Sequence, residues 1–112
     1  TFWSVWEGEQ LAGIGALKLL DDKHGELKSM RTAPNYLRRG VASLILRHIL
    51  QVAHDRCLHR LSLETGTQAG FTACHQLYLK HGFVDCEPFA DYQLDPHSRF
   101  LSLTLCENNE LP

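Results

Sequence analysis

The sequence predicts an α+β fold in which a twisted, mixed but mostly antiparallel sheet carries helices on both faces, in the order βββαβαββ. Three observations indicate this fold. Apolar and polar side chains alternate between Phe2 and Thr32, which is typical of strands. From Gly40 onward the apolar spacing changes to three and four residues, which is typical of a helix. A strand, a helix and another strand at this spacing join parallel neighbours, so the sheet is mixed.

The first three strands are predicted as an antiparallel run. Side chains alternate over Phe2–Trp6, and Glu7-Gly8-Glu9 is typical of a turn. The segment Leu11–Leu20 is apolar and punctuated by glycine, which favours a central strand that pairs with the first as a hairpin. Asp21–Gly25 forms the next turn, and Glu26–Thr32 alternates again. Consecutive strands joined by short turns pair antiparallel, so these three form one side of the sheet.

The remaining residues are predicted to hold both helices. In Gly40–Arg56 the apolar residues form two adjacent helical stripes, so this helix packs on a sheet and is covered again. Arg60–Thr65 alternates as a short strand. Gly70–His81 has helical spacing and is followed by a glycine, which favours the left-handed turn after a helix. The last strands are expected at Phe83–Cys86 and Phe100–Leu105.

Length and composition indicate one globular domain. The chain has 112 residues, of which 44% are hydrophobic and 21% charged, and these values are ordinary for a single domain over residues 1–112. A strand pattern from the first residue, with no methionine before Thr1, predicts that this domain begins upstream. The net charge of −2 gives no overall attraction to nucleic acid, so nucleic acid is not expected as a partner.

Cysteine usage and hydropathy predict a cytoplasmic protein. Cys57, Cys74, Cys86 and Cys106 lie far apart with no C-x-x-C pair, which favours buried free thiols in a reducing compartment over two disulfides. No apolar run approaches the ~20 residues that span a membrane, and no signal-peptide pattern is present, so no membrane partner is expected. Seven histidines accompany the cysteines, but their spacing is not that of zinc ligands, and no metal site is predicted.

The segment Thr32–Ser43 predicts an anion-binding site. A strand ends, a turn with Pro34 follows, and Arg38, Arg39 and Gly40 open the long helix. The first turn of a helix has unpaired N–H groups that attract anions, and two guanidinium groups strengthen that attraction. Glycine at a helix start favours the close approach of a ligand to the backbone. These residues suit a pyrophosphate of the kind found in nucleotides.

Two motifs together make the chain similar to the GNAT superfamily of acetyl-CoA-dependent N-acetyltransferases. Leu37-Arg38-Arg39-Gly40-Val41-Ala42 matches the phosphate-binding signature of the family at its Gly and Ala, but Leu37 replaces the usual Gln or Arg. Leu77-Tyr78-Leu79-Lys80-His81-Gly82-Phe83 matches a helix end that many members share, although Phe71 and Cys74 stand where Asn and Ala are usual.

The resemblance covers essentially the whole chain, from the second strand of the GNAT-like fold onward, and the opening strand and two helices of the family would precede Thr1. It implies acetyl-CoA as the acetyl-donor cosubstrate. The donor would lie at the helix start and along a strand that separates from its neighbour and pairs with pantetheine. The residues at these places are Met30, Arg31, Thr32, Arg38, Arg39, Gly40, Val41, Ala42 and Ser43.

Amine acetylation needs a base, an oxyanion site and an acid for the departing thiolate. Glu64 is the candidate base, because alternation places it at the end of a parallel strand, where ligands collect; a surface carboxylate paired with Lys or Arg is the alternative. Glu26 is the rival, for which a solvated turn residue is the favoured interpretation, and a water relay stays open. The resemblance implies Tyr78 as the acid, with a core aromatic residue as the alternative. Backbone N–H groups around Met30–Thr32 would hold the oxyanion.

The loop Pro88–Pro96 is predicted to border the acceptor. Asp91 and Tyr92 would attract a cationic amine there, although turn chemistry explains the same residues. The function indicated is direct transfer of acetyl from acetyl-CoA to a primary amine of a small molecule or peptide, in a ternary complex. A non-catalytic acyl-CoA-binding regulatory module is the alternative, which Leu37 and Phe71 favour. The sequence leaves open the acceptor and the oligomeric state, with a homodimer among the alternatives.

Overall fold

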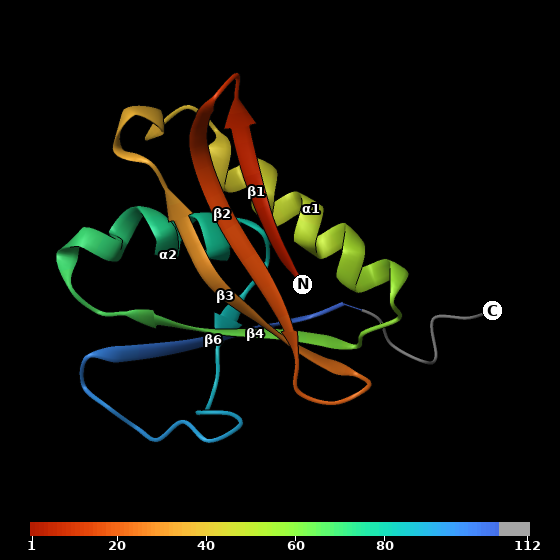
Figure 1. Cartoon of the computed structure of the whole chain (residues 1–112). Helices are drawn as coiled ribbons and strands as arrows, with labels where there is room; N and C mark the ends of the chain where they lie inside the picture. Colours follow the sequence, from red (N-terminus) through yellow and green to blue (C-terminus); the bar gives the residue numbers. More distant parts are fainter. Residues whose placement is uncertain (106–112) are drawn as a thin grey trace.

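The computed structural model describes residues 1–105 as a six-stranded sheet with two α-helices (Figure 1). The strands are β1 (Phe2–Glu7), β2 (Gln10–Leu19), β3 (His24–Thr32), β4 (Arg60–Gly66), β5 (Val84–Asp85) and β6 (Ser98–Thr104), and the helices are α1 (Val41–Asp55) and α2 (Thr72–Lys80). Across the sheet the strands lie in the order β1-β2-β3-β4-β6-β5. The predicted order of elements along the chain is confirmed.

β3 and β4 are the parallel pair that the strand–helix–strand run predicted. All other neighbours pair antiparallel, which confirms a mixed and mostly antiparallel sheet. The parallel contact joins His24–Glu26 to Arg60–Ser62 and then stops. Beyond it the two strands diverge (Figure 1), and β4 continues beside β6 alone. The sheet therefore contains a gap between its two middle strands.

A bulge bends β3 at the place where it leaves β4. Ser29 has a φ of 59°, in the left-handed region. The partners across β2 and β3 change there from Ala16 and Lys28 to Ile14 and Arg31, so β3 carries one extra residue. An extra residue bends its strand and increases the local twist. The bulge thus turns the second half of β3 away from β4.

Both helices pack against the same face of the sheet, rather than one on each face as expected. A Cβ on Gly13 of β2 would lie 2.7 Å from the side chain of Val41 in α1, which shows how closely α1 approaches. The leucines that alternate along β4 point to this face and are shared by both helices. One buried cluster joins the elements and includes Leu17, Leu27, Ile45, Ile49, Leu61, Leu63, Tyr78 and Leu101.

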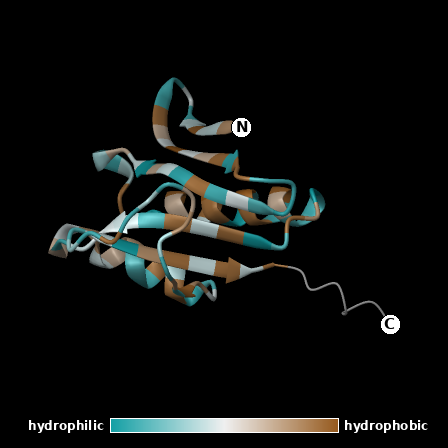
Figure 2. Ribbon diagram, turned by 90° about the horizontal axis from the view of Figure 1, so that it is seen from below, coloured by the Kyte–Doolittle hydropathy of each residue, from teal (hydrophilic) through white to brown (hydrophobic). Residues whose placement is uncertain are grey.

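Over β3, β4 and β6 the opposite face of the sheet is covered by the loop between β5 and β6. Phe89 of this loop lies edge-on to Phe100 of β6, with 6.0 Å between ring centroids, and Tyr92 lies 5.6 Å from the same ring. Figure 2 shows the corresponding alternation of hydrophobic and hydrophilic residues along the strands. Ser62 lies on this face and is fully buried. The loop therefore creates a second, smaller enclosed region that contains polar side chains.

Several boundaries differ from the predictions. α2 begins at Thr72 because Ala69–Phe71 forms a separate 3-10 turn. The strand predicted at Phe83–Cys86 is reduced to the two residues of β5, since Phe83 turns into the core instead. The predicted final strand begins two residues earlier, and its last residue, Leu105, lies outside β6.

The cysteines also differ from the prediction of buried thiols. Cys57 is exposed because it follows α1 in a turn with a φ of 59°, while Cys74 and Cys86 are half-buried. These three are free thiols. Cys106 lies outside the described residues.

Candidate active site

A pocket of about 450 Å³ lies at the gap between β3 and β4. Four residues predicted for the site line it: Met30 and Arg31 from β3, Glu64 from β4 and Tyr78 from α2. They meet there because β3 bends away at its bulge while α2 packs against the same end of β4. The candidate base, the candidate acid and part of the candidate pantetheine strand therefore surround one cavity.

Tyr78 lines this pocket with a side chain that is almost entirely buried. The residue is 6% exposed, and its ring lies edge-on to Phe83 with 5.7 Å between centroids. Within residues 1–105 no buried side-chain N or O atom lacks a partner, and none of the side-chain hydrogen bonds found there includes the Tyr78 hydroxyl, so its oxygen is not fully enclosed. Burial raises the pKa of Tyr78, with a smaller contribution from Cys74. The phenol therefore keeps its proton at neutral pH.

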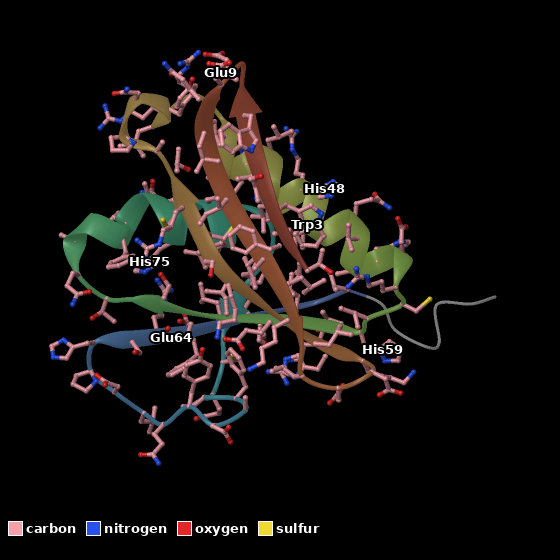
Figure 3. The ribbon with its side chains drawn as sticks, in the orientation of Figure 1. Trp3, Glu9, His48, His59, Glu64 and His75 are labelled. Carbon is pink, nitrogen blue, oxygen red and sulfur yellow. The ribbon has the colours of Figure 1, made fainter. Side chains whose placement is uncertain are left out.

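Glu64 is exposed, and its Oε2 accepts a 2.6 Å hydrogen bond from the Ser98 hydroxyl. The alternative considered for it was an ion pair with Lys or Arg, but none of the ion pairs in the described part of the chain includes Glu64. Figure 3 shows Glu64 on one side of β4 and His75 on the other, toward α2. A carboxylate held by a neutral hydroxyl remains available to accept a proton.

Glu26 contradicts the prediction of a solvated turn residue. It lies within β3 and is 2% exposed. The Tyr92 hydroxyl donates a 2.6 Å hydrogen bond to its Oε2. Burial, followed by this hydrogen bond, raises the pKa of Tyr92, and the charges of Glu26 and Glu64 add to that shift. The sequence did not reveal this environment because the covering side chain comes from a position 66 residues away.

The start of α1 has no side-chain cap, and Gly40, which precedes the helix, is exposed. Gly40 has a φ of 82°, a left-handed conformation that glycine adopts without strain. Its carbonyl accepts a hydrogen bond from the Leu44 N–H at 3.0 Å. The N–H groups of the first helical turn, at Val41, Ala42 and Ser43, have no partner within the helix. Their availability is what an anion site at this place requires.

The two arginines before Gly40 have different environments. Arg39 lies 3.6 Å from Glu7 in an exposed ion pair, and its guanidinium stacks over the ring of Tyr36 at 4.8 Å from the centroid. The Tyr36 hydroxyl in turn donates to Glu7 at 3.0 Å. Arg38 takes part in none of the ion pairs of residues 1–105, and its φ of 64° is unusual for a residue other than glycine. Arg38 is thus the guanidinium more available to a phosphate.

Three other predicted residues line neighbouring pockets. Thr32 lines a cavity of about 510 Å³ beside the beginning of β2. Asp91 and Tyr92 line a third cavity of about 200 Å³, together with Glu26 and two lysines, Lys18 and Lys28. Neither lysine is among the residues predicted for the site, although alternation along β2 and β3 places both on the face of Glu26.

Phe71 forms an apolar wall of the pocket between β3 and β4. It is 41% exposed, and its ring lies over Gly66 so closely that a Cβ there would come within 2.5 Å of the ring. His75 fixes the same end of β4, since its Nε2 lies 2.7 Å from the Gly66 carbonyl oxygen. The aromatic side chain at the position where Asn is usual in the family therefore has a packing partner of its own.

Within residues 1–105, no three or more His, Cys, Asp and Glu side chains gather as a metal site would require. No helix in this range is long and apolar enough to cross a membrane.

Comparison with known proteins decides the family. A sequence model described as the acetyltransferase (GNAT) family matches residues 1–83. The chain belongs to the GNAT family. The enzyme class expected from the sequence, an acyltransferase of GNAT type, is therefore confirmed at the level of the family.

This GNAT chain is similar to two curated bacterial proteins. It is 97% identical over 112 residues to the uncharacterized N-acetyltransferase YedL of Escherichia coli (strain K12), covering 100% of this chain and 70% of that protein. It is 56% identical over 105 residues to the uncharacterized N-acetyltransferase YsnE of Bacillus subtilis (strain 168), covering 94% of this chain and 70% of that protein.

Solved structures share the fold. An acetyltransferase from Streptococcus agalactiae has a TM-score of 0.80 and 28% identity, and the match covers 93% of this chain and 66% of that one. A GNAT family acetyltransferase from Elizabethkingia anophelis with acetyl-CoA bound has a TM-score of 0.76 and 18% identity, covering 93% of this chain and 75% of that one. The chain thus spans slightly less than two thirds of the Streptococcus structure.

Proposed function

We propose that this GNAT chain, acting as a single domain, transfers acetyl from acetyl-CoA directly to a primary amine. The observation that carries the proposal is the pocket at the gap between β3 and β4. A neutral phenol, Tyr78, and a carboxylate free of cations, Glu64, line this one cavity. An acid and a base at the same cavity are what amine acetylation requires.

The start of α1 is the proposed site for the diphosphate of the donor. Arg38 supplies positive charge, and the uncapped N–H groups after Gly40 supply hydrogen-bond donors. Met30, Arg31 and Thr32, which lie beyond the end of the parallel pairing, offer backbone groups to an extended pantetheine chain. The acetyl-CoA bound by the Elizabethkingia relative supports this choice of donor.

The proposed transfer balances as follows. Glu64, directly or through a water molecule, takes a proton from the amine, and the nitrogen lone pair forms the new C–N bond with the thioester carbonyl carbon. The C–S bond breaks, and the sulfur leaves with the bonding electron pair. Tyr78 gives its proton to this sulfur and is protonated again from the solvent. The products are an amide and a free thiol.

The raised pKa of Tyr78 has two effects on this step. It keeps the phenol protonated at every pH at which the protein works, so the acid is always present. It also makes the phenol a weaker acid, so proton transfer to the thiolate depends on close contact within the pocket. The apolar side chains that line the pocket, Phe71 and Leu63 among them, favour that contact.

The test is an acceptor screen on the full-length protein, read as free thiol released from acetyl-CoA, followed by Tyr78→Phe. We expect turnover with the wild type and a loss of roughly a hundredfold in kcat in the variant, with the calorimetric Kd for CoA unchanged. CoA binding without turnover of any amine by either protein would support a non-catalytic acyl-CoA-binding module. No heat from CoA at millimolar concentration would refute the donor site.

A further inference from the structure

The 200 Å³ pocket under the loop between β5 and β6 carries both signs of charge. Glu26 and Asp91 contribute carboxylates, Lys18 and Lys28 contribute ammonium groups, and Tyr92 forms one wall. This volume lies below the roughly 300–1,000 Å³ of pockets that hold drug-sized ligands. The pocket therefore suits a small ligand that has a positive and a negative group of its own.

The opposite charges in this pocket do not neutralise one another. Lys18 stands directly across from Glu26 in the register of β2 and β3, where an ion pair forms easily. The ion pairs found within residues 1–105 nevertheless include neither Lys18 nor Lys28. The Glu26 carboxylate is turned toward the Tyr92 hydroxyl instead, at 2.6 Å. Both lysines thus keep their capacity to bind an anion.

This small pocket adjoins the pocket that holds Glu64 and Tyr78. Lys28 lines both cavities. Tyr92 connects them as well, because its hydroxyl contacts Glu26 while Glu64 lies near enough to act on its titration. A ligand in the small pocket would therefore have its amine close to the proposed transfer site.

We infer that the acceptor is a free α-amino acid, whose carboxylate binds Lys18 and Lys28 while its amino group lies between Glu26 and Glu64. This inference rests on the proposed function and names the class of its acceptor. The same residues fit any small molecule with a primary amine beside an anionic group, such as phosphoethanolamine. Of the two anions the carboxylate is favoured, because a phosphate would bring a second negative charge next to Asp91 and Glu26.

The test compares matched amines on the full-length protein with saturating acetyl-CoA. Each α-amino acid is assayed beside its amide and its decarboxylated amine, with O-phosphoethanolamine as a further arm. We expect at least one amino acid to exceed its amide and its decarboxylated amine by roughly tenfold or more in kcat/KM. The reason is that both analogues lack the carboxylate and lose its charged hydrogen bonds to the lysines. We expect Lys18→Met and Lys28→Met to reduce that ratio toward one, while Lys28→Arg preserves it.

Lys23→Met is the matched control, because Lys23 is an exposed lysine in the turn before β3 and lines neither pocket. Its preference for amino acids should equal that of the wild type. The ratio of two substrates in one protein sample is insensitive to partial unfolding, so it separates recognition from stability.

The remaining outcomes are decisive. Equal turnover of amino acids and of amines without a carboxylate would overturn the inference and leave the acetyltransferase function standing. Preference for O-phosphoethanolamine would assign the lysines to a phosphate and also overturn it. Calorimetric binding of CoA without acetylation of any amine in the panel would refute the acceptor class, whereas no binding of CoA would refute the proposed function itself.

Discussion

Tyr92 is the residue that links the two carboxylates of the candidate site. Its hydroxyl donates to Glu26, and Glu64 contributes to the shift of its pKa. The two acids have different surroundings, since Glu26 is 2% exposed whereas Glu64 is exposed and hydrogen-bonded to Ser98. Similar carboxyl groups in unlike environments are suited to different tasks. We therefore propose that Glu64 removes the proton and that Glu26 orients the amine.

Exchanging each carboxylate for an amide separates these tasks. Glu64→Gln should lower kcat by roughly a hundredfold or more, because the proton acceptor is lost. Glu26→Gln should mainly raise the KM for the amine, because an amide keeps the shape of the side chain but not its charge. Steady-state kinetics across pH on both variants measures this. If Glu26→Gln reduces kcat as strongly with KM unchanged, the base is Glu26.

Predictability at the scale of single residues depended on where each partner lies. Strand alternation placed Glu64 near the end of β4, and a motif shared with the family placed Tyr78 near the end of α2; both residues line one pocket. The burial of Glu26 could not be predicted in this way, because it depends on Tyr92 from a distant loop. The pairing of Arg39 with Glu7 depends likewise on the β1–β2 turn.

The start of α1 is the element on which donor binding depends. Gly40 has a left-handed φ, and a Cβ added there would meet no atom within 4 Å. Gly8, in the turn between β1 and β2, shares both properties, with a φ of 59°. The two glycines thus have the same conformational demand, but only Gly40 lies at the proposed phosphate site.

Alanine at either glycine should destabilise the fold by about 1–2 kcal/mol, the cost of left-handed backbone for a residue with a Cβ. Only Gly40→Ala should also weaken CoA binding, because relief of the strain moves the N–H groups of the first turn. Urea unfolding and calorimetry with CoA measure the two effects. Gly8→Ala is the control, and an equal loss of CoA affinity in both variants would contradict the role of Gly40.

The bounds of helices and strands were predicted well where apolar residues repeat regularly over a long segment. They were predicted poorly where the backbone departs from regular strand geometry. The bounds of α1 and of the first three strands lie within about two residues of the prediction, because their apolar patterns are long. The bulge at Ser29 was missed, since a polar residue at an alternating position gives no sign of an extra residue. β5 was overestimated because Phe83 resembles a strand residue but turns into the core, while Cys86 keeps only a single backbone hydrogen bond to Phe100 of β6.

At the scale of the whole molecule, the core encloses titratable groups as well as hydrocarbon. The chain has three tyrosines, and the pKa of each is raised, in every case chiefly by burial. A phenol with a raised pKa in the folded state stays protonated when the same phenol in the unfolded chain has ionised. Unfolding therefore releases protons above pH 10, and stability must fall as the pH rises.

We expect the free energy of unfolding to be constant below about pH 10 with respect to these groups and to decrease above it. A phenol as buried as Tyr78 contributes a slope of up to ~1.4 kcal/mol per pH unit in that range. Tyr78→Phe should show a shallower decline, because Tyr36 and Tyr92 remain. Urea unfolding between pH 8 and 11.5 measures both slopes, and identical slopes would show that Tyr78 ionises equally easily in the folded state.

The fold class could be predicted from the sequence because the spacing of apolar residues within each segment distinguishes strands from helices. The distribution of the helices could not, because the alternating leucines of β4 fit a helix on either side. Only the packing of Tyr78 and Phe83 into the cluster with Leu61 and Leu63 places α2 beside α1. Because both helices lie on one face, the loop between β5 and β6 covers the opposite face over β3, β4 and β6. This loop forms the pocket that contains both signs of charge.

The short parallel contact between β3 and β4 gives the sheet an internal edge. Unpaired strand backbone normally lies at the rim of a sheet, where it recruits other chains and promotes aggregation. Here residues 27–32 and 63–66 carry such backbone in the middle of the sheet, with neighbouring strands and helix α2 around it. A folded protein is too wide to reach this unpaired backbone. A slender extended chain with its own amide groups is narrow enough to reach it. The same groups that would be a hazard at the rim thus act as a size filter.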